Sequence, residues 1–206
     1  MSYTRLREQA SRYYTSKVAE HGATARGVDW NSEDSQRLRF EQLLKVCRRE
    51  PCSLLDYGCG YGALLDHLER LRLRIDYCGY DCAPAMIEQA IAAHPHHSAS
   101  FFEVDEEQLS PADYVVASGL LNVKLEASDE AWHEYMLKVV DRLAALSREG
   151  FAFNALSLYS DPDRRQPYLH YADPLRWFDH CKRRISRAVT LLHDYPLFEF
   201  TILVRH

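Results

Sequence analysis

The 206-residue sequence lacks any apolar stretch near the ~18 residues that a membrane-spanning helix needs. Its first nine residues, MSYTRLREQ, contain no apolar signal-peptide core. An excess of basic residues is also missing: the formal net charge is −5, whereas nucleic-acid-binding proteins favour a basic face. These absences argue against a membrane protein and against a nucleic-acid partner, and they predict a cytoplasmic protein.

Paired metal-ligand spacings are missing as well. The sequence has six cysteines, but no two of them form a C-x-x-C pair or a zinc-binding spacing. Several fall in segments predicted to be buried strands, which is typical of reduced thiols in a cytosolic enzyme. Internal repeats, low-complexity tracts and interdomain linkers are absent. We therefore expect no metal site and a single domain over 1–206, while the oligomeric state stays open.

The most informative segment present is SLLDYGCGYG, residues 53–62. A short apolar run ends in Asp56 and is followed by Gly58, Gly60 and Gly62, which lack a Cβ and so allow a sharp turn and close approach to a ligand. The apolar run predicts a buried parallel strand, and ALLDHLERL after the glycines predicts a helix. Strand, glycine turn and helix form the nucleotide-binding corner of a doubly wound α/β sheet.

The glycine spacing and two acids distinguish this segment from a dinucleotide-binding one. The third glycine comes one residue too early for the dinucleotide fingerprint G-x-G-x-x-G. Asp56 would repel a pyrophosphate but can hold an ammonium group, directly or through water. Asp81 ends the segment RIDYCGYD about 20 residues past the loop, where a ribose-binding acid is expected. Asp81 is also placed to cap the next helix, because Ala83-Pro84 suits a first turn. Both roles can hold at once, since they use different lone pairs.

The glycine loop with its preceding acid resembles the first motif of the class I S-adenosylmethionine (SAM) dependent methyltransferases. Their cofactor carries an amino acid end and no phosphate. By pattern the resemblance covers residues 35–206, and its sharp motifs lie between Asp56 and Asn122. It implies a doubly wound α/β fold with a seven-stranded sheet whose last strand runs antiparallel. It also implies an N-terminal helical lid over 1–50 and a sheet core over 51–206.

The alternation of patterns along the chain agrees with that fold. We expect strands at 53–57, 74–80, 98–105, 112–120 and 150–157, and a closing hairpin in RAVTLLHDY and LFEFTILVR with its turn at Pro196. Helices are expected at 3–20, from Ser32 onward, and at 61–71, 83–94, 128–147 and 173–182. A polar loop is expected at 158–172.

The resemblance also implies a set of SAM contacts. Asp105 ends the third strand, where family members hold the adenine amino group, and Glu106 and Glu107 are alternatives. Arg39 is placed to pair with the methionine carboxylate, with a surface pair to Glu33 or Ser35 as the alternative. The other expected SAM-binding residues are Asp56, Gly58, Cys59, Gly60, Gly62, Asp81, Cys82, Met86, Ser118, Gly119 and Leu120.

The candidate catalytic residues come from the lid and the late loops. Tyr13, Tyr14 and Trp30 offer aromatic faces to the sulfonium, and two adjacent tyrosines cannot both face the core of one helix. Asn154, Tyr159 and His170 belong to the region that would enclose an acceptor. His170, His21 and His193 are candidate bases, and none carries a family signature.

Three functions are compatible with these residues. The first is methyl transfer from SAM to a small molecule in secondary or specialised metabolism. The second resembles the azetidine-2-carboxylate synthases, in which SAM is cyclised and methylthioadenosine leaves, so that SAM is the only substrate. The third is a non-catalytic SAM-binding module. An NPPY motif is absent, with SGLLN at its position, which disfavours methylation of a nucleic-acid base or a glutamine.

Overall fold

The computed structural model describes residues 2–28, 32–95, 100–102 and 105–206. Its strands are β1 (Cys52–Tyr57), β2 (Ile75–Tyr80), β3 (Ser100–Phe102), β4 (Ala112–Ala117), β5 (Ser147–Leu156), β6 (Ala188–Leu192) and β7 (Glu199–Arg205). Its helices are α1 (Tyr3–His21), α2 (Glu33–Leu44), α3 (Ala63–Leu71), α4 (Pro84–Ala93), α5 (Asp129–Leu146) and α6 (Pro174–Arg184). Short 3₁₀ turns are η1 (Ala25–Val28), η2 (Glu106–Gln108) and η3 (Pro162–Arg164).

The strands form one seven-stranded sheet in the order β3-β2-β1-β4-β5-β7-β6. β1 to β5 pair in parallel, whereas β7 is antiparallel to both β5 and β6. The predicted doubly wound α/β class with its closing hairpin is confirmed. The strand order reverses at β1, so a crevice opens between the carboxyl ends of β1 and β4, where sheets of this kind bind their ligands.

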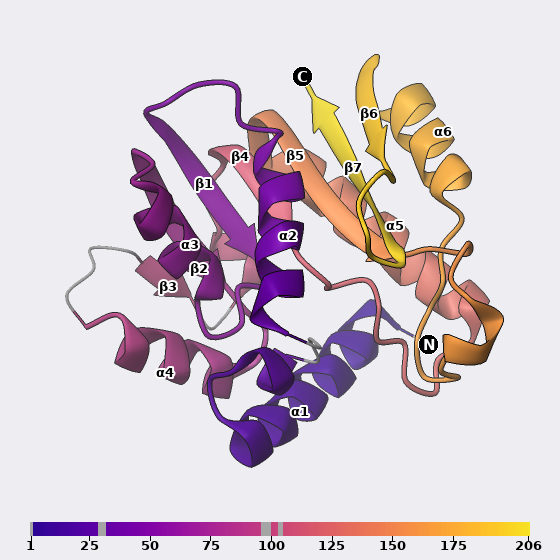
Figure 1. Ribbon diagram of the computed structural model, residues 1–206, viewed down its shortest axis with the longest axis horizontal. Helices are drawn as coiled ribbons and strands as arrows, with labels where there is room; N and C mark the ends of the chain where they lie inside the picture. Colours follow the sequence, from indigo (N-terminus) through magenta and orange to yellow (C-terminus); the bar gives the residue numbers. More distant parts are fainter. Residues whose placement is uncertain (1, 29–31, 96–99, 103–104) are drawn as a thin grey trace.

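Helices cover both faces of the sheet (Figure 1). On one face α5 and α6 bury large side chains such as Trp132, Met136 and Trp177 against β4, β5 and β7. On the other face α2 and α3 bury Phe40 and Leu64 against β1, β2 and β4. Because apolar side chains are buried on both faces, the central strands are nearly continuous apolar runs, and their carboxyl ends are held in fixed positions.

Helix α1 lies across the end of the sheet at which the parallel strands finish (Figure 1). Ser2 caps it by accepting a hydrogen bond from the Arg5 backbone N–H. Leu6 joins the core beneath α5, and Val18 packs against Met86 of α4. The region expected to act as a lid is therefore also a packed part of the domain.

Several predicted boundaries shift by a few residues, and two shifts matter for the site. β4 ends at Ala117 rather than 120, so Ser118-Gly119-Leu120 is a turn at the carboxyl edge. β5 begins at Ser147, immediately after α5, although its first residues are polar; the pairing of Ser147 with Ala112 satisfies this backbone. The predicted third strand, 98–105, is observed only at Ser100–Phe102 and partly lies outside the described residues.

Candidate active site

The glycine loop turns sharply where β1 ends. Gly58, Gly60 and Gly62 all have positive φ angles, of 88°, 54° and 88°, which side chains with a Cβ rarely adopt. The loop is tied to the neighbouring strand because the backbone N–H groups of Gly58 and Cys59 both donate to the Tyr80 carbonyl, at 2.7 and 2.9 Å. This arrangement holds a bare stretch of backbone at the crevice between β1 and β4.

Asp81 connects that loop to α4. Its Oδ2 accepts a hydrogen bond from the Gly60 backbone N–H at 3.0 Å, and its Oδ1 accepts one from Ala83 at 2.8 Å. The N-cap residue of α4 is Ala83, which has no side-chain capping hydrogen bond, so the predicted capping role of Asp81 is not observed; its bond to the Ala83 N–H lies just before the helix, and its further lone pairs remain for a ligand. Burial raises the pKa of this carboxyl, although the backbone hydrogen bonds oppose the shift.

Asp56 is more deeply enclosed. Only 2 % of its surface is exposed, and one carboxylate oxygen accepts a hydrogen bond from the Tyr77 hydroxyl at 2.9 Å. Burial raises its pKa to about 7, and the nearby Asp81 carboxylate adds to the shift. Two acids held in one crevice create a site that favours a cation.

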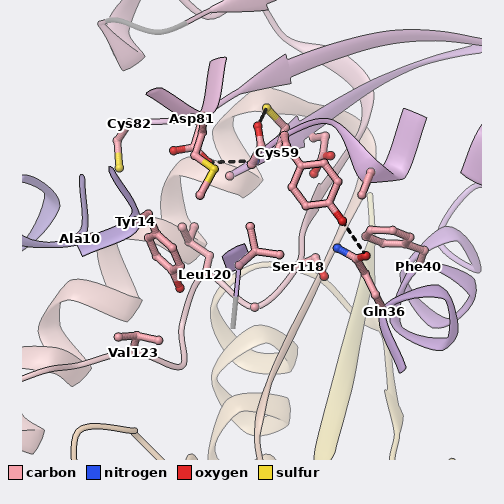
Figure 2. Close-up of a pocket in the computed structure, with 18 of the residues that line it drawn as sticks. Ala10, Tyr14, Gln36, Phe40, Cys59, Asp81, Cys82, Ser118, Leu120 and Val123 are labelled. Atoms are coloured by element: carbon pink, nitrogen blue, oxygen red, sulfur yellow. Dashed lines mark hydrogen bonds between the residues drawn. The ribbon is translucent and has the colours of Figure 1, made fainter. Parts of the chain in front are cut away.

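These elements line one cavity, which we call the glycine-loop cavity. Figure 2 shows Asp81 and Cys82 on one side of it and Gln36 with Phe40 on another. Eleven of the predicted site residues line it: Tyr14, Asp56, Gly58, Cys59, Gly60, Asp81, Cys82, Met86, Ser118, Gly119 and Leu120. Helix, loop and strand residues far apart in the sequence therefore meet here.

Sequence reasoning missed other residues that line this cavity. The Tyr61 hydroxyl donates to Gln36 Oε1 at 3.1 Å, so the glycine loop is bonded to α2 (Figure 2). Phe40 lies one helical turn beyond Gln36 on α2, and Trp132 reaches the cavity from α5. The position of Tyr61 between two loop glycines could have identified it as a cavity residue. No sequence feature identifies Trp132, because only the fold brings it near β1.

The turn after β4 offers a polar group to the cavity. The Ser118 hydroxyl is buried and has no hydrogen-bond partner among the described residues. The next residue, Gly119, donates its backbone N–H to Asn154 Oδ1 at 2.7 Å, so β5 holds the turn in place. The cavity thus combines two acids, an unsatisfied hydroxyl and the backbone of the glycine loop, beside the apolar walls of Leu120 and Met86. This donor set fits a cationic, amino-acid-bearing nucleoside such as SAM.

Comparison with known proteins decides the family. A sequence model described as a methyltransferase domain matches residues 55–150. Rv1506c of Mycobacterium tuberculosis, which is named as a methyltransferase, is 46 % identical over 160 residues, covering 76 % of this chain and 94 % of the relative. The chain belongs to the class I SAM-dependent methyltransferases. SAM is its cofactor.

A second relative of this methyltransferase is more distant. The malonyl-[acyl-carrier protein] O-methyltransferase of Hahella chejuensis is 32 % identical over 99 residues, which are 48 % of this chain. The match spans only 36 % of that relative's own length.

Solved structures share the fold at low sequence identity. The DhpI complex with SAM and HEP has a TM-score of 0.64 at 16 % identity, with 96 % of this chain and 97 % of that chain covered. Magnesium protoporphyrin IX methyltransferase from Synechocystis PCC 6803 with bound SAH has a TM-score of 0.62 at 12 % identity, with 98 % and 99 % covered.

Three of the expected SAM contacts of this methyltransferase lie elsewhere. Arg39 is buried, and its Nε donates to both carboxylate oxygens of Glu199, at 3.0 and 2.8 Å, so its pairing with Glu199 is a buried contact and not a surface one. Gly62 caps α3 outside the cavity. Asp105 is exposed and caps η2 by accepting from the Glu107 N–H.

The acid beside Asp105 is the buried one. Glu106 accepts hydrogen bonds from the Tyr3 hydroxyl and from Arg7, both at 3.0 Å, and it lies 3.4 Å from Arg142. Burial raises the Tyr3 pKa to about 12, and the Glu106 carboxylate adds to the shift. Glu106 therefore anchors α1, and none of the three acids lines the glycine-loop cavity.

The aromatic candidates divide between two places. Tyr14 lines the glycine-loop cavity. Tyr13 packs edge-on against the ring of Tyr14, with the ring centroids 5.2 Å apart, and its own ring lies beneath the Lys17 ammonium. Tyr159 is exposed beside His193. Trp30 lies outside the described residues. The expectation that adjacent tyrosines point to different surroundings agrees with this placement.

A second, larger cavity adjoins the first; we call it the adjoining cavity. The two share Tyr14, Val28, Gly119 and Val123 as lining residues. Its remaining walls are Lys17, His21, Arg39, Asn122, Leu156, Ser160, Arg164, Gln166, Tyr168, Leu169, Tyr171, Phe198 and Glu199. The loop 158–172 therefore encloses this space together with α1 and α2.

The other candidate catalytic residues lie behind or beside this space. Asn154 is fully buried, and its Nδ2 donates to Glu199 Oε2 at 3.1 Å, so it supports the cavity wall. His170 pairs with Asp129 at 3.3 Å in a different surface hollow, and burial lowers its pKa. Of the three histidines considered as bases, only His21 lines the adjoining cavity.

The described residues contain no group of three or more His, Cys, Asp or Glu side chains able to hold a metal ion. None of the helices in the described part of the chain has the length and apolar character to cross a membrane.

Proposed function

We propose that this methyltransferase methylates a small molecule bound in the adjoining cavity, while SAM occupies the glycine-loop cavity. The observation that carries this proposal is the shared wall: Tyr14, Val28, Gly119 and Val123 line both cavities. A donor in one and an acceptor in the other would meet across these residues. Biosynthesis of a specialised metabolite is the setting we infer for such a reaction.

Different residues at the β1–β4 crevice would bind different parts of SAM. Asp56 and the loop backbone would receive the amino acid end, because a buried carboxylate gains most from an ammonium partner. Asp81 would accept hydrogen bonds from the ribose hydroxyls with its remaining lone pairs. Leu120 and Met86 provide apolar surface for the adenine. We propose that Ser118 completes its hydrogen bonding on the ligand.

When bound, SAM supplies a methyl group made electrophilic by its sulfonium. The protein's contribution is then alignment and the exclusion of water. Tyr14 reaches both cavities from α1 and offers an aromatic face where a sulfonium would be stabilised. His21, at the end of the same helix, is placed to take a proton from an acceptor that must lose one.

The adjoining cavity also bears on the two other functions. A SAM-cyclising enzyme has no second substrate, so it needs no acceptor space. A binding module needs neither an acceptor cavity nor a base to deprotonate an acceptor. The adjoining cavity and the residues that it shares with the glycine-loop cavity favour methyl transfer. We propose that 1–206 acts as one domain in the cytoplasm, with residues 1–50 as a lid.

The test is to incubate the purified enzyme with SAM, first alone and then with a panel of small hydroxy, amino and carboxy compounds. Mass spectrometry should find SAM largely intact without an acceptor and S-adenosylhomocysteine with one. Tyr14→Ala should lower turnover strongly, while Tyr159→Ala, at an exposed tyrosine that lines neither cavity, serves as the control. Methylthioadenosine formed catalytically from SAM alone would refute methyl transfer, and SAM retained unchanged with every acceptor would favour a binding module.

A further inference from the structure

Asn122 lies in the turn after β4, between two residues that belong to both cavities. Gly119 and Val123 line the glycine-loop cavity as well as the adjoining one, and Figure 2 shows Val123 at the first of them. Asn122 lines the adjoining cavity and is only 5 % exposed. Its backbone N–H donates to the Gly119 carbonyl at 3.3 Å. A group bound by Asn122 would therefore lie close to the wall that the two cavities share.

All but one of the polar groups of Asn122 are bonded within the protein. Besides the N–H already described, its backbone carbonyl accepts from the His170 N–H at 2.8 Å. Its side-chain Oδ1 accepts from the Leu156 N–H at 2.9 Å. Because a backbone N–H can only donate, the side-chain atom that faces Leu156 must be the oxygen, and this fixes the orientation of the amide. The Nδ2 group donates to none of the described residues, so it is the group that Asn122 can offer to a ligand.

The turn that carries Asn122 is held from two sides of the domain. The Trp132 indole of α5 donates to the Leu121 carbonyl at 3.0 Å. Asn154 of β5 accepts the Gly119 N–H at 2.7 Å. An amide fixed in this way needs little rearrangement to bind a ligand, so binding costs little conformational entropy.

The side chains nearest to Asn122 in the adjoining cavity are apolar. Val123 follows it in the chain, and Leu156 and Leu169 line the same cavity. In an apolar pocket, a few fixed polar groups set the orientation of the ligand. A ligand that excluded water here without accepting from Nδ2 would leave a buried donor unpaired, which costs free energy. A carbonyl oxygen suits this place because it only accepts, whereas a hydroxyl would add an O–H that the neighbouring leucines cannot satisfy.

We propose that Asn122 determines the specificity for the acceptor, and that its Nδ2 donates to a carbonyl oxygen close to the atom that receives the methyl group. The acceptor class is then a small molecule with a nucleophilic hydroxyl or amine near a ketone, ester or amide carbonyl. Asn122 forms no covalent bond and exchanges no proton; it orients the nucleophile toward the shared wall. The proposal rests on the proposed function, since it names the substrate class of that same site.

The experiment compares matched probes on the enzyme saturated with S-adenosylhomocysteine. Isothermal titration measures binding of 3′-hydroxyacetophenone, 3-hydroxybenzamide and 3-ethylphenol, of which the last has the same ring and hydroxyl but no carbonyl. At least one carbonyl probe should bind about ten-fold more tightly than 3-ethylphenol, because a site built around a hydrogen bond rejects the analogue that lacks it.

The variant Asn122→Asp separates this role from a structural one. It keeps an oxygen that can accept from the Leu156 N–H, but it removes the Nδ2 donor. The carbonyl probes should then bind no more tightly than 3-ethylphenol. Its affinity for S-adenosylhomocysteine should equal that of the unaltered enzyme, because Asn122 does not line the glycine-loop cavity.

Gln89→Glu is the matched control. It makes the same change from amide to carboxylate at an exposed position of α4 that lines neither cavity, so the preference for the carbonyl probes should persist. A second measurement needs no variant. In NMR spectra of the unaltered enzyme, the side-chain amide protons of Asn122 should shift downfield with a carbonyl probe and not with 3-ethylphenol.

The proposal is overturned if 3-ethylphenol binds as tightly as both carbonyl probes, or if neither carbonyl probe binds at millimolar concentration. It is also overturned if a folded Asn122→Asp variant keeps the preference. Those results with normal SAM binding would leave the methyltransferase proposal intact. Loss of SAM binding by the unaltered enzyme would instead contradict the proposed function.

Discussion

The buried pair of Arg39 and Glu199 is the contact whose removal should be most damaging. It joins α2 to β7 over 160 residues of sequence, and the two side chains are only 6 % and 1 % exposed. In Arg39→Met the Glu199 carboxylate keeps Asn154 but loses its charged partner. Removing one member of a buried pair costs about 3–5 kcal/mol, because the remaining charge stays desolvated. The free energy of unfolding should fall by that amount.

Urea unfolding followed by circular dichroism measures this change. Arg49→Met is the matched control, because Arg49 pairs with Glu149 and Asp113 at the exposed surface and its loss should hardly shift the midpoint. The double variant Arg39→Met/Glu199→Gln should be more stable than Arg39→Met alone. It removes the uncompensated charge, and the new amide oxygen can still accept from Asn154.

SAM affinity is a second measurement of the same Arg39–Glu199–Asn154 network. Asn154 accepts the Gly119 N–H with its Oδ1, so a displaced Glu199 should also loosen the turn that lines both cavities. SAM affinity should fall in Arg39→Met and recover in part in the double variant. The reasoning is refuted if Arg39→Met unfolds at the same urea concentration as Arg49→Met, or if the double variant is the less stable of the two.

Further outcomes concern the cofactor cavity. Asp81→Ala should weaken SAM binding by about ten-fold or more, since each lost charge-assisted hydrogen bond contributes about 1.5–3 kcal/mol; unchanged calorimetric affinity would contradict the ribose assignment. Because burial raises the Asp56 pKa to about 7, SAM should bind more weakly as the pH falls below that value, and Asp56→Asn should remove this dependence. The same raised pKa means that the unliganded protein loses stability as the pH rises from about 4 through 7, and a stability that rose over this range in the wild type but not in Asp56→Asn would contradict it. Gly60→Val should abolish SAM binding, because its φ of 54° disfavours a branched residue and its Cβ would lie 3.1 Å from Val28; binding at wild-type affinity would show that the loop tolerates a side chain.

The contiguous part of the site was predictable because local spacing sets its geometry. Asp56, the loop glycines and Asp81 lie within 26 residues of one strand–loop–helix–strand unit, in which chain connectivity allows few arrangements. The fold class followed from the same alternation of strands and helices. The roles of individual residues were harder to predict where acids are adjacent, as at Asp105 and Glu106. The local sequence does not indicate which of the two side chains is buried.

The sequence by itself determined the family, the glycine loop and the acids beside it. Only the tertiary structure decided which partner Arg39 takes, that Glu106 anchors α1, and which histidine faces the adjoining cavity. These facts depend on the strand order, which places β7 beside β5 and brings Glu199 beneath α2. The adjoining cavity is assembled from α1, α2, the loop 158–172 and the start of β7. No local sequence pattern predicts that these distant segments lie together, because their contact depends on the burial and packing of the whole chain.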